Sequence, residues 1–336
     1  MARLREVGPV LRKVGAWQFV KNVFHEIGDD GVFTIAAAVA FYWFLAFVPL
    51  LIFMLSLLPL LPESVRASTQ EQVTKKITEY GAVGSAHDIV TKQMDNLLDP
   101  KKPRGGLVSV AMLAAIWASS AGLNATMSAL DDCYDIEKRR SFIKQRGLAV
   151  IMTIGVVLAV LIVLLLIPIS GVALTLLERN LPAQELHRWL STPTRVLLDL
   201  ARYTIGLALV MLIISSIYQF GVTVRRRWTL ITPGAVFSVF VVLLTAYGFS
   251  FYIERMGQTS YNQTYGALAG IVILLLLFYF YAVAFLIGAE INAEIDFAIV
   301  GLHDDPAEPN DAPLVASNGE DLERYKQQLI TRRKSC

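Results

Sequence analysis

Six long apolar stretches are the feature that most constrains this chain. A membrane-spanning helix needs about 20 mostly apolar residues to cross a hydrocarbon core about 30 Å thick. The stretches that reach this length are Phe33 to Leu61, Leu107 to Leu130, Leu148 to Leu177, Val196 to Phe220, Pro233 to Ile253 and Ala267 to Ile291. Only 17% of the 336 residues are charged, against roughly 25% in soluble domains. The sequence therefore predicts an all-α, polytopic membrane bundle with six transmembrane helices.

The distribution of Lys and Arg predicts the orientation of the bundle. Basic residues gather before the first span, after the second and after the fourth, and cytoplasmic loops are enriched in such residues. The clusters are Arg3, Arg5, Arg12, Lys13 and Lys21; then Lys138, Arg139, Arg140, Lys144 and Arg146; then Arg225, Arg226 and Arg227. Both termini are therefore predicted to be cytoplasmic.

The segments outside the spans divide the chain into three parts. Residues 1–31 carry apolar residues at helical spacing, which predicts a basic, amphipathic helix. This helix either lies on the inner leaflet or packs against the cytoplasmic ends of the bundle. Residues 32–295 form the transmembrane domain. Within it, loop 62–106 is expected to form an external helical cap, as a packed decoration or as a lid over a pathway. Residues 296–336 are acidic and proline-rich, then basic, and are expected to be a disordered tail.

Several residues inside the spans are candidates for a transport pathway. Pro49 and Pro168 each remove a backbone hydrogen bond and favour a kink, and broken helices can line transport sites. Asn124 lies on a polar face that it shares with two serines, where it either joins helices or lines a wet cavity. Asp131 follows at the end of that span. Arg202 is expected to pair locally with Asp199 or, as a minority alternative, to contact an anionic substrate.

Thr232 and Pro233 have the pattern of a helix start, with Thr232 as the N-cap and Pro233 as the first helical residue.

The last span combines small residues at its start with acids at its end. Gly266 and Gly270 form a small-xxx-small pattern that favours close packing with another helix. Glu290 and Glu294 are four residues apart and share one helical face, with Asn292 turned away from both. Ala267 to Ala289 already spans about 34 Å at 1.5 Å per residue, so Glu290 is expected near the cytoplasmic headgroups, where the helix leaves the membrane.

Two interpretations of these acids stay open. Glu290 and Glu294 form a structural collar of salt bridges with the cytoplasmic arginines, or they form a cation or proton site at the inner mouth of a pathway. The first interpretation is favoured because the length of the span places Glu290 at the same membrane face as Arg139, Arg140 and Arg225 to Arg227.

Four sequence pieces together resemble the YihY family of bacterial inner-membrane proteins, also called the BrkB virulence-factor family. They are "AAAVAFYWFLAFVPLL", "TPGAVFSV", "TYGALAGIVILLLLFYFYAVAFLIGAEINAE" and "LNATMSALDDCYDIEKRRSF". In the last piece Asn124, Tyr134 and Arg140 occupy matching places. The resemblance covers about residues 20 to 298 and implies the six-span plan and a multi-pass location in the inner membrane.

Some members of that family have been labelled ribonucleases, but the residues here do not support an enzyme. The four histidines, His25, His87, His187 and His303, are scattered, and the two cysteines form no metal-binding pattern. We therefore predict no catalytic activity, no cofactor, no metal and no nucleic-acid partner.

Three functions remain, in decreasing order of preference: transport or flipping of a lipid or amphiphilic solute, a non-catalytic scaffold of the cell envelope, and a membrane-bound nuclease. Membrane lipids are the expected partners, and oligomerisation is left open.

Overall fold

The structure is a computed structural model, and it describes residues 4–57, 106–136, 140–180, 192–223, 229, 231–256 and 261–303. All regular structure within these residues is α-helical, which confirms the predicted fold class. The helices are α1 (Leu4–Val14), α2 (Ala16–Asp29), α3 (Val32–Leu57), α6 (Gly106–Cys133), α7 (Phe142–Asn180), α9 (Thr192–Gly221), α10 (Pro233–Met256) and α11 (Tyr261–His303). The expected cap over residues 62–106 lies almost entirely outside the described residues.

Within the described ranges, five helices contain a window long and apolar enough to cross a membrane. These windows are Val32–Leu51, Phe142–Ile162, Tyr203–Gly221, Pro233–Tyr252 and Gly270–Ile299. Each overlaps one of the predicted spans, and the remaining prediction, Leu107 to Leu130, forms helix α6. The chain is therefore a polytopic helical membrane protein. The total of six spans and the cytoplasmic termini stay predictions.

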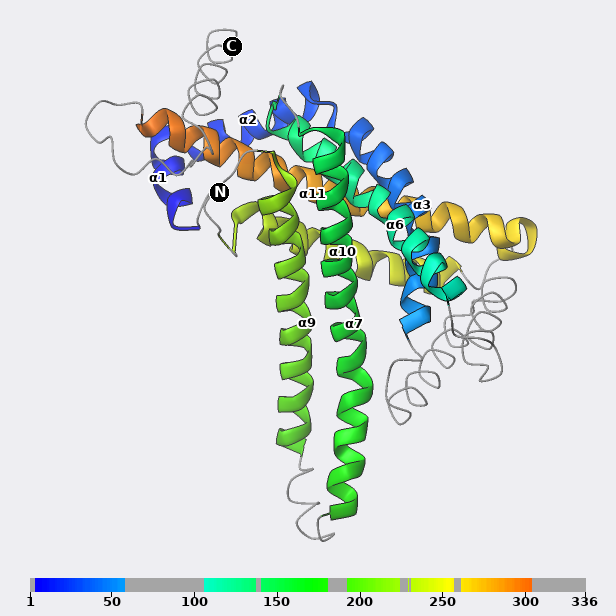
Figure 1. The fold of residues 1–336 in the computed structure, drawn as a ribbon. Helices are drawn as coiled ribbons and strands as arrows, with labels where there is room; N and C mark the ends of the chain where they lie inside the picture. Colours follow the sequence, from blue (N-terminus) through cyan, green and yellow to red (C-terminus); the bar gives the residue numbers. More distant parts are fainter. Residues whose placement is uncertain are drawn as a thin grey trace.

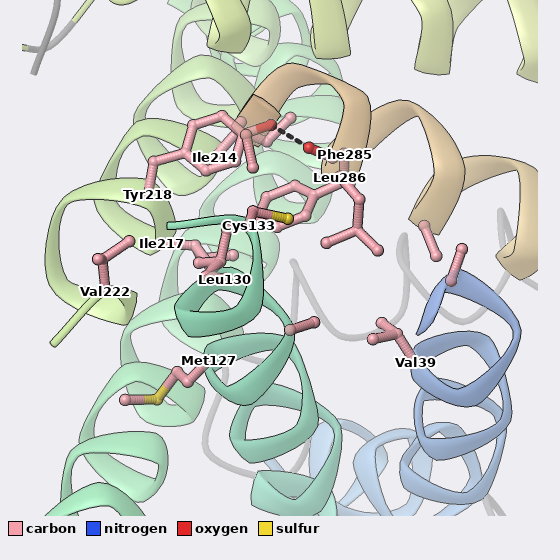
Figure 2. Close-up of a cluster of buried hydrophobic side chains, with 14 of the residues drawn as sticks. Val39, Met127, Leu130, Cys133, Ile214, Ile217, Tyr218, Val222, Phe285 and Leu286 are labelled. Carbon is pink, nitrogen blue, oxygen red and sulfur yellow. Dashed lines mark hydrogen bonds between the residues drawn. The ribbon is translucent and has the colours of Figure 1, made fainter. Parts of the chain in front are cut away.

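The most extensive contacts between spans join α3 to α6, α10 to α11, α11 to α3 and α6 to α7, and α7 has a smaller contact with α9. Figure 1 shows α7 and α9 running side by side away from the other helices, while α11 extends across the molecule toward α1. One buried apolar cluster joins α2, α3, α6, α7, α9, α10 and α11. Its largest members include Met127, Tyr218 and Phe285, which Figure 2 shows in close-up.

Trp43 on α3 and Thr126 on α6 illustrate how one pair is fixed. The indole Nε1 of Trp43 donates a hydrogen bond to Thr126 Oγ1 at 2.9 Å. Gly122 lies next to this bond, and a Cβ there would meet Ala46 and Trp43 at 3.2 Å. The small residue lets the helices approach closely enough for the bond to form.

Helix α11 does not end where the sequence predicted. The acids from Glu290 onward indicated an exit from the helix and a disordered tail from residue 296, yet α11 continues to His303. The reason is a second apolar face: Ile295 and Ile299 are buried against Val10 of α1. Burial of these isoleucines stabilises two further turns. The expected tail beyond His303 lies outside the described residues.

Pro49 lies inside α3 and Pro168 within the bounds of α7, as expected from the sequence. Whether either proline contributes to transport stays a prediction.

Candidate functional site

A set of buried polar groups lies at one end of the bundle, where α6 and α9 end and α10 begins beside the second half of α11. We call this set the junction and define it by Asp131, Tyr218, Thr232, Glu290 and Asn292. All five side chains are buried, with exposed fractions of 0 to 2%. Buried polar groups are costly unless they are hydrogen-bonded, so the partners of each one show what it does.

Asn292 of α11 fixes the start of α10. Its Oδ1 accepts a hydrogen bond from the backbone N–H of Gly234 at 2.9 Å, and its Nδ2 donates to Thr232 Oγ1 at 3.2 Å. Thr232 Oγ1 also accepts from the N–H of Ala235 at 3.2 Å. The first N–H groups of a helix have no partner within the helix, and these bonds supply one. The predicted N-cap at Thr232 and start at Pro233 are confirmed.

Gly234 and Gly288 let α10 and α11 approach to backbone contact. A Cβ on Gly234 would lie 1.8 Å from the carbonyl oxygen of Gly288. A Cβ on Gly288 would lie 2.0 Å from Ser238 Oγ. Only glycine fits at either position.

The close packing predicted for Gly270 is not seen among the described residues, none of which lies within 4 Å of the position of its Cβ. The surroundings of Gly266 lie outside the described residues. The contact between small residues forms 18 residues further along α11, at Gly288, because that is where α10 begins.

Two hydroxyl groups bind the backbone of α11 next to this contact. Tyr218 Oη lies 2.5 Å from the carbonyl oxygen of Phe285 and 2.7 Å from Ser238 Oγ, which itself lies 3.0 Å from the carbonyl oxygen of Ala284. The bond from Tyr218 to Phe285 is the dashed line in Figure 2. The Tyr218 ring also stacks on Phe285, with centroids 4.5 Å apart. These contacts join α9, α10 and α11.

Asp131 and Arg140 hold the end of α9. Asp131 accepts hydrogen bonds from the N–H and the hydroxyl of Thr223, both at 2.7 Å. The guanidinium of Arg140 donates to the carbonyl oxygens of Gly221, at 2.8 Å, and Val222. The last carbonyls of a helix lack partners within it, and a cation there is favoured by the helix dipole. Asp131, which the sequence suggested as part of a pathway, therefore contacts Thr223 and holds the chain just after α9.

Glu290 differs from the other residues of the junction. It is 2% exposed, within the membrane-spanning window of α11, and its Oε1 accepts no hydrogen bond from any described residue. Its carboxyl group lies within hydrogen-bonding reach of the Cys133 thiol and the Asp30 carboxyl, and Glu26 adds a further acidic group nearby. Among the described residues no cation pairs with Glu290, but Arg139 and Arg225 to Arg227 of the expected collar lie outside those residues, so the collar stays a prediction.

Glu294 lies one turn further along α11 and has a different partner. Its Oε1 accepts a hydrogen bond from Asn22 Nδ2 of α2 at 2.8 Å. The predicted arrangement is confirmed, because Glu290 and Glu294 both face the side of α11 that meets α2, while Asn292 faces α10.

The polar face of α6 joins it to α7. Gln145 donates to Ser128 Oγ at 2.8 Å and approaches the carbonyl oxygen of Asn124 at 3.4 Å. Asn124 is partly buried, and its role in a pathway stays a prediction. Arg202 lies within α9, but its side chain is outside the described residues.

The sequence prediction missed the hydroxyl pair of Tyr218 and Ser238 and the glycine pair of Gly234 and Gly288. One signal was present: "TPGAVFSV" supplies Thr232, Gly234 and Ser238, and "IGAEINAE" supplies Gly288 and Asn292. These two pieces of the family resemblance are in contact in the fold. Within the described residues, no three His, Cys, Asp or Glu side chains form a group that could hold a metal ion.

The fold and the junction define a polytopic α-helical membrane protein whose spans meet at one buried polar end. Comparison with known families gives a more specific assignment. The chain matches the family described as "Virulence factor BrkB" over residues 23–313, and it belongs to that family. This confirms the resemblance seen in the sequence.

Two known proteins are similar to this chain over most of its length. The ribonuclease-like protein YfkH of Bacillus subtilis (strain 168) is 31% identical over 276 residues, which cover 82% of this chain and 94% of the relative. A protein of Stenotrophomonas maltophilia (strain R551-3), described as a UPF0761 membrane protein, is 23% identical over 281 residues, or 83% of this chain and 61% of the relative. No solved structure matches the chain.

Proposed function

We propose that this protein moves a lipid or an amphiphilic solute across the inner membrane, and that Glu290 binds and releases a proton or a cation during the cycle. The observation that carries the proposal is the burial of Glu290 within an apolar span, with one carboxyl oxygen lacking a partner among the described residues. A charged acid on a membrane-spanning helix is costly, by up to about 2.5 to 3.5 kcal/mol at the centre of the bilayer on insertion scales. Acids kept at such positions mark ion pathways and proton relays.

The surroundings of Glu290 support binding of a positive charge. The groups that face it are a thiol and other acids, namely Cys133 on α6, Asp30 after α2 and Glu26 on α2. Two carboxyl groups as close as Glu290 and Asp30 repel each other when both are charged, so a proton or a cation between them is favoured. Binding or loss of that charge would change the attraction between α11 and α2, which are in contact at this point.

The lipid-facing surface supports an amphiphilic substrate. Large apolar side chains are exposed along α3, α7, α9, α10 and α11, including Leu45, Ile151, Leu207 and Phe240. An amphiphile in the bilayer can move along such surfaces without passing through water.

The test is a flux measurement on purified protein in liposomes. Fluorescent phosphatidylethanolamine and phosphatidylglycerol report transfer between leaflets, with and without an imposed pH gradient. We expect Glu290→Gln to lose most of the rate or its response to the gradient. Glu294→Gln is the matched control, because it changes an acid on the same face that already has Asn22 as a partner. Unchanged flux in a folded Glu290→Gln protein contradicts the assignment of Glu290, and no flux in the wild type contradicts lipid transport.

The name of YfkH describes that relative as ribonuclease-like. We rank a nuclease function below transport for this chain. It would be supported by RNA cleavage with purified protein that is lost when residues of this chain are substituted.

A further inference from the structure

Helix α2 carries an exposed apolar face. Trp17 is 82% exposed, Phe24 70% and Val20 42%. These residues are three and four positions apart, so they lie on one side of the helix. Contiguous exposed apolar side chains of this size mark a surface that another phase or molecule covers.

The other side of α2 is already occupied. Val23 and Ile27 are buried in the main apolar cluster, and Asn22 is bound to Glu294 of α11. The rotation of α2 about its axis is therefore fixed by the bundle. Its exposed face is not free to turn inward and pack there.

The position of α2 in the chain indicates what covers the face. Gly31, with a φ of 61°, makes the turn after α2, and the spanning window of α3 begins at Val32. Phe33, at the start of that window, is 53% exposed. The apolar face of α2 is thus followed within a few residues by a helix that enters the hydrocarbon core. Trp is enriched at this boundary, because its ring is apolar and its N–H is polar.

We propose that α2 lies in the headgroup layer of the membrane that α3 crosses, with Trp17, Val20 and Phe24 immersed. Gln18 and Lys21, both exposed, lie beside this face and remain among headgroups and water. A helix with one apolar and one polar side, parallel to the surface, is the usual form of an interfacial helix. The sequence left two alternatives for this segment, contact with the membrane surface or packing on the bundle. In this proposal both hold, because one side of α2 packs on the bundle and the next side contacts lipid. This inference does not depend on the proposed transport function.

The test measures immersion of α2 in the full-length protein. Nitroxide side chains are placed singly at Trp17, Phe24 or Gln18 in a Cys336→Ser background, with Cys133 left in place because it is buried. Each protein is inserted as one chain per nanodisc of phosphatidylethanolamine and phosphatidylglycerol. Collisions with oxygen, which concentrates in lipid, are compared with collisions with a water-soluble nickel complex. These substitutions leave Val23 and Ile27 unchanged.

We expect labels at Trp17 and Phe24 to favour oxygen over nickel severalfold, and the label at Gln18 to show the reverse. Equal nickel access at all three positions overturns the proposal, because the face would then be in water. Protection of the labels at Trp17 and Phe24 from both reagents also overturns it, because protein and not lipid would then cover the face.

Discussion

Asn292 shows how one side chain can determine a helix contact. Its amide carries both an acceptor and a donor, and it uses one on the N–H of Gly234 and the other on Thr232. An aspartate would keep the acceptor and lose the donor, and a leucine would lose both. Because Asn292 is fully buried, water cannot replace either bond.

We predict that Asn292→Ala destabilises the protein by about 1 to 3 kcal/mol, since it leaves buried polar groups at the start of α10 without partners. The measurement is the free energy of unfolding in mixed micelles during SDS titration, followed by far-UV circular dichroism. Asn22→Ala removes one part-buried bond to Glu294 and is the control with the smaller expected loss. Equal losses of unfolding free energy for the two variants would show that the Asn292 cap on α10 stabilises the protein no more than the bond between Asn22 and Glu294.

Substitutions at two glycines of α11, Gly288 and Gly270, are expected to have different effects on stability. Gly288→Ala places a Cβ against Ser238 and Gly234, so we predict a loss of about 1 to 3 kcal/mol or more from overpacking. Gly270→Ala meets nothing within 4 Å and should leave stability unchanged or raise it by up to about 1 kcal/mol through helix propensity. Thermal unfolding in detergent compares the two. A stable Gly288→Ala protein would contradict the backbone contact between α10 and α11.

The long-range contacts at the ends of helices could not be predicted from the sequence. The apolar stretches predicted most helices because length and composition are local properties. The partners of Asp131 and Arg140 were not predictable, because Thr223 and Gly221 are 92 and 81 residues away. The extension of α11 was missed for a related reason. Ile295 and Ile299 favour a helix only once Val10 of α1 packs on them.

Arg140 is predicted to be required for the end of α9. Its planar guanidinium reaches two carbonyl oxygens at once, whereas the single ammonium of lysine cannot bridge them in the same way. Arg140→Lys should therefore raise amide hydrogen exchange in the last turn of α9, with little change in the middle of that helix. Arg146→Lys is the control, because Arg146 donates to the carbonyl oxygen of Trp117 on α6 and does not touch α9. Equal exchange in the two variants would exclude Arg140 as the cap of α9.

Among the described residues, many of the buried polar contacts between helices lie at one end of the bundle. That end holds the start of α3, the ends of α6 and α9, the start of α10 and the acids of α11. In the sequence, basic clusters follow the second and fourth predicted spans, which correspond to α6 and α9. Pro49 and Asn124 are apart from these contacts, the side chain of Arg202 lies outside the described residues, and the predicted roles of all three rest on the sequence alone. The junction should therefore face the cytoplasm.

The native cysteines allow a direct test of this orientation. Cys133 is buried, so a membrane-impermeant maleimide should react only with Cys336, the other cysteine of the chain. We predict labelling in inside-out membrane vesicles and none in right-side-out vesicles, because the excess of Lys and Arg places the C-terminus in the cytoplasm. Cys336→Ser should abolish the signal in both preparations. Labelling of Cys336 in right-side-out vesicles alone would show that the orientation is the opposite of the predicted one. Glu290 would then lie toward the outer surface.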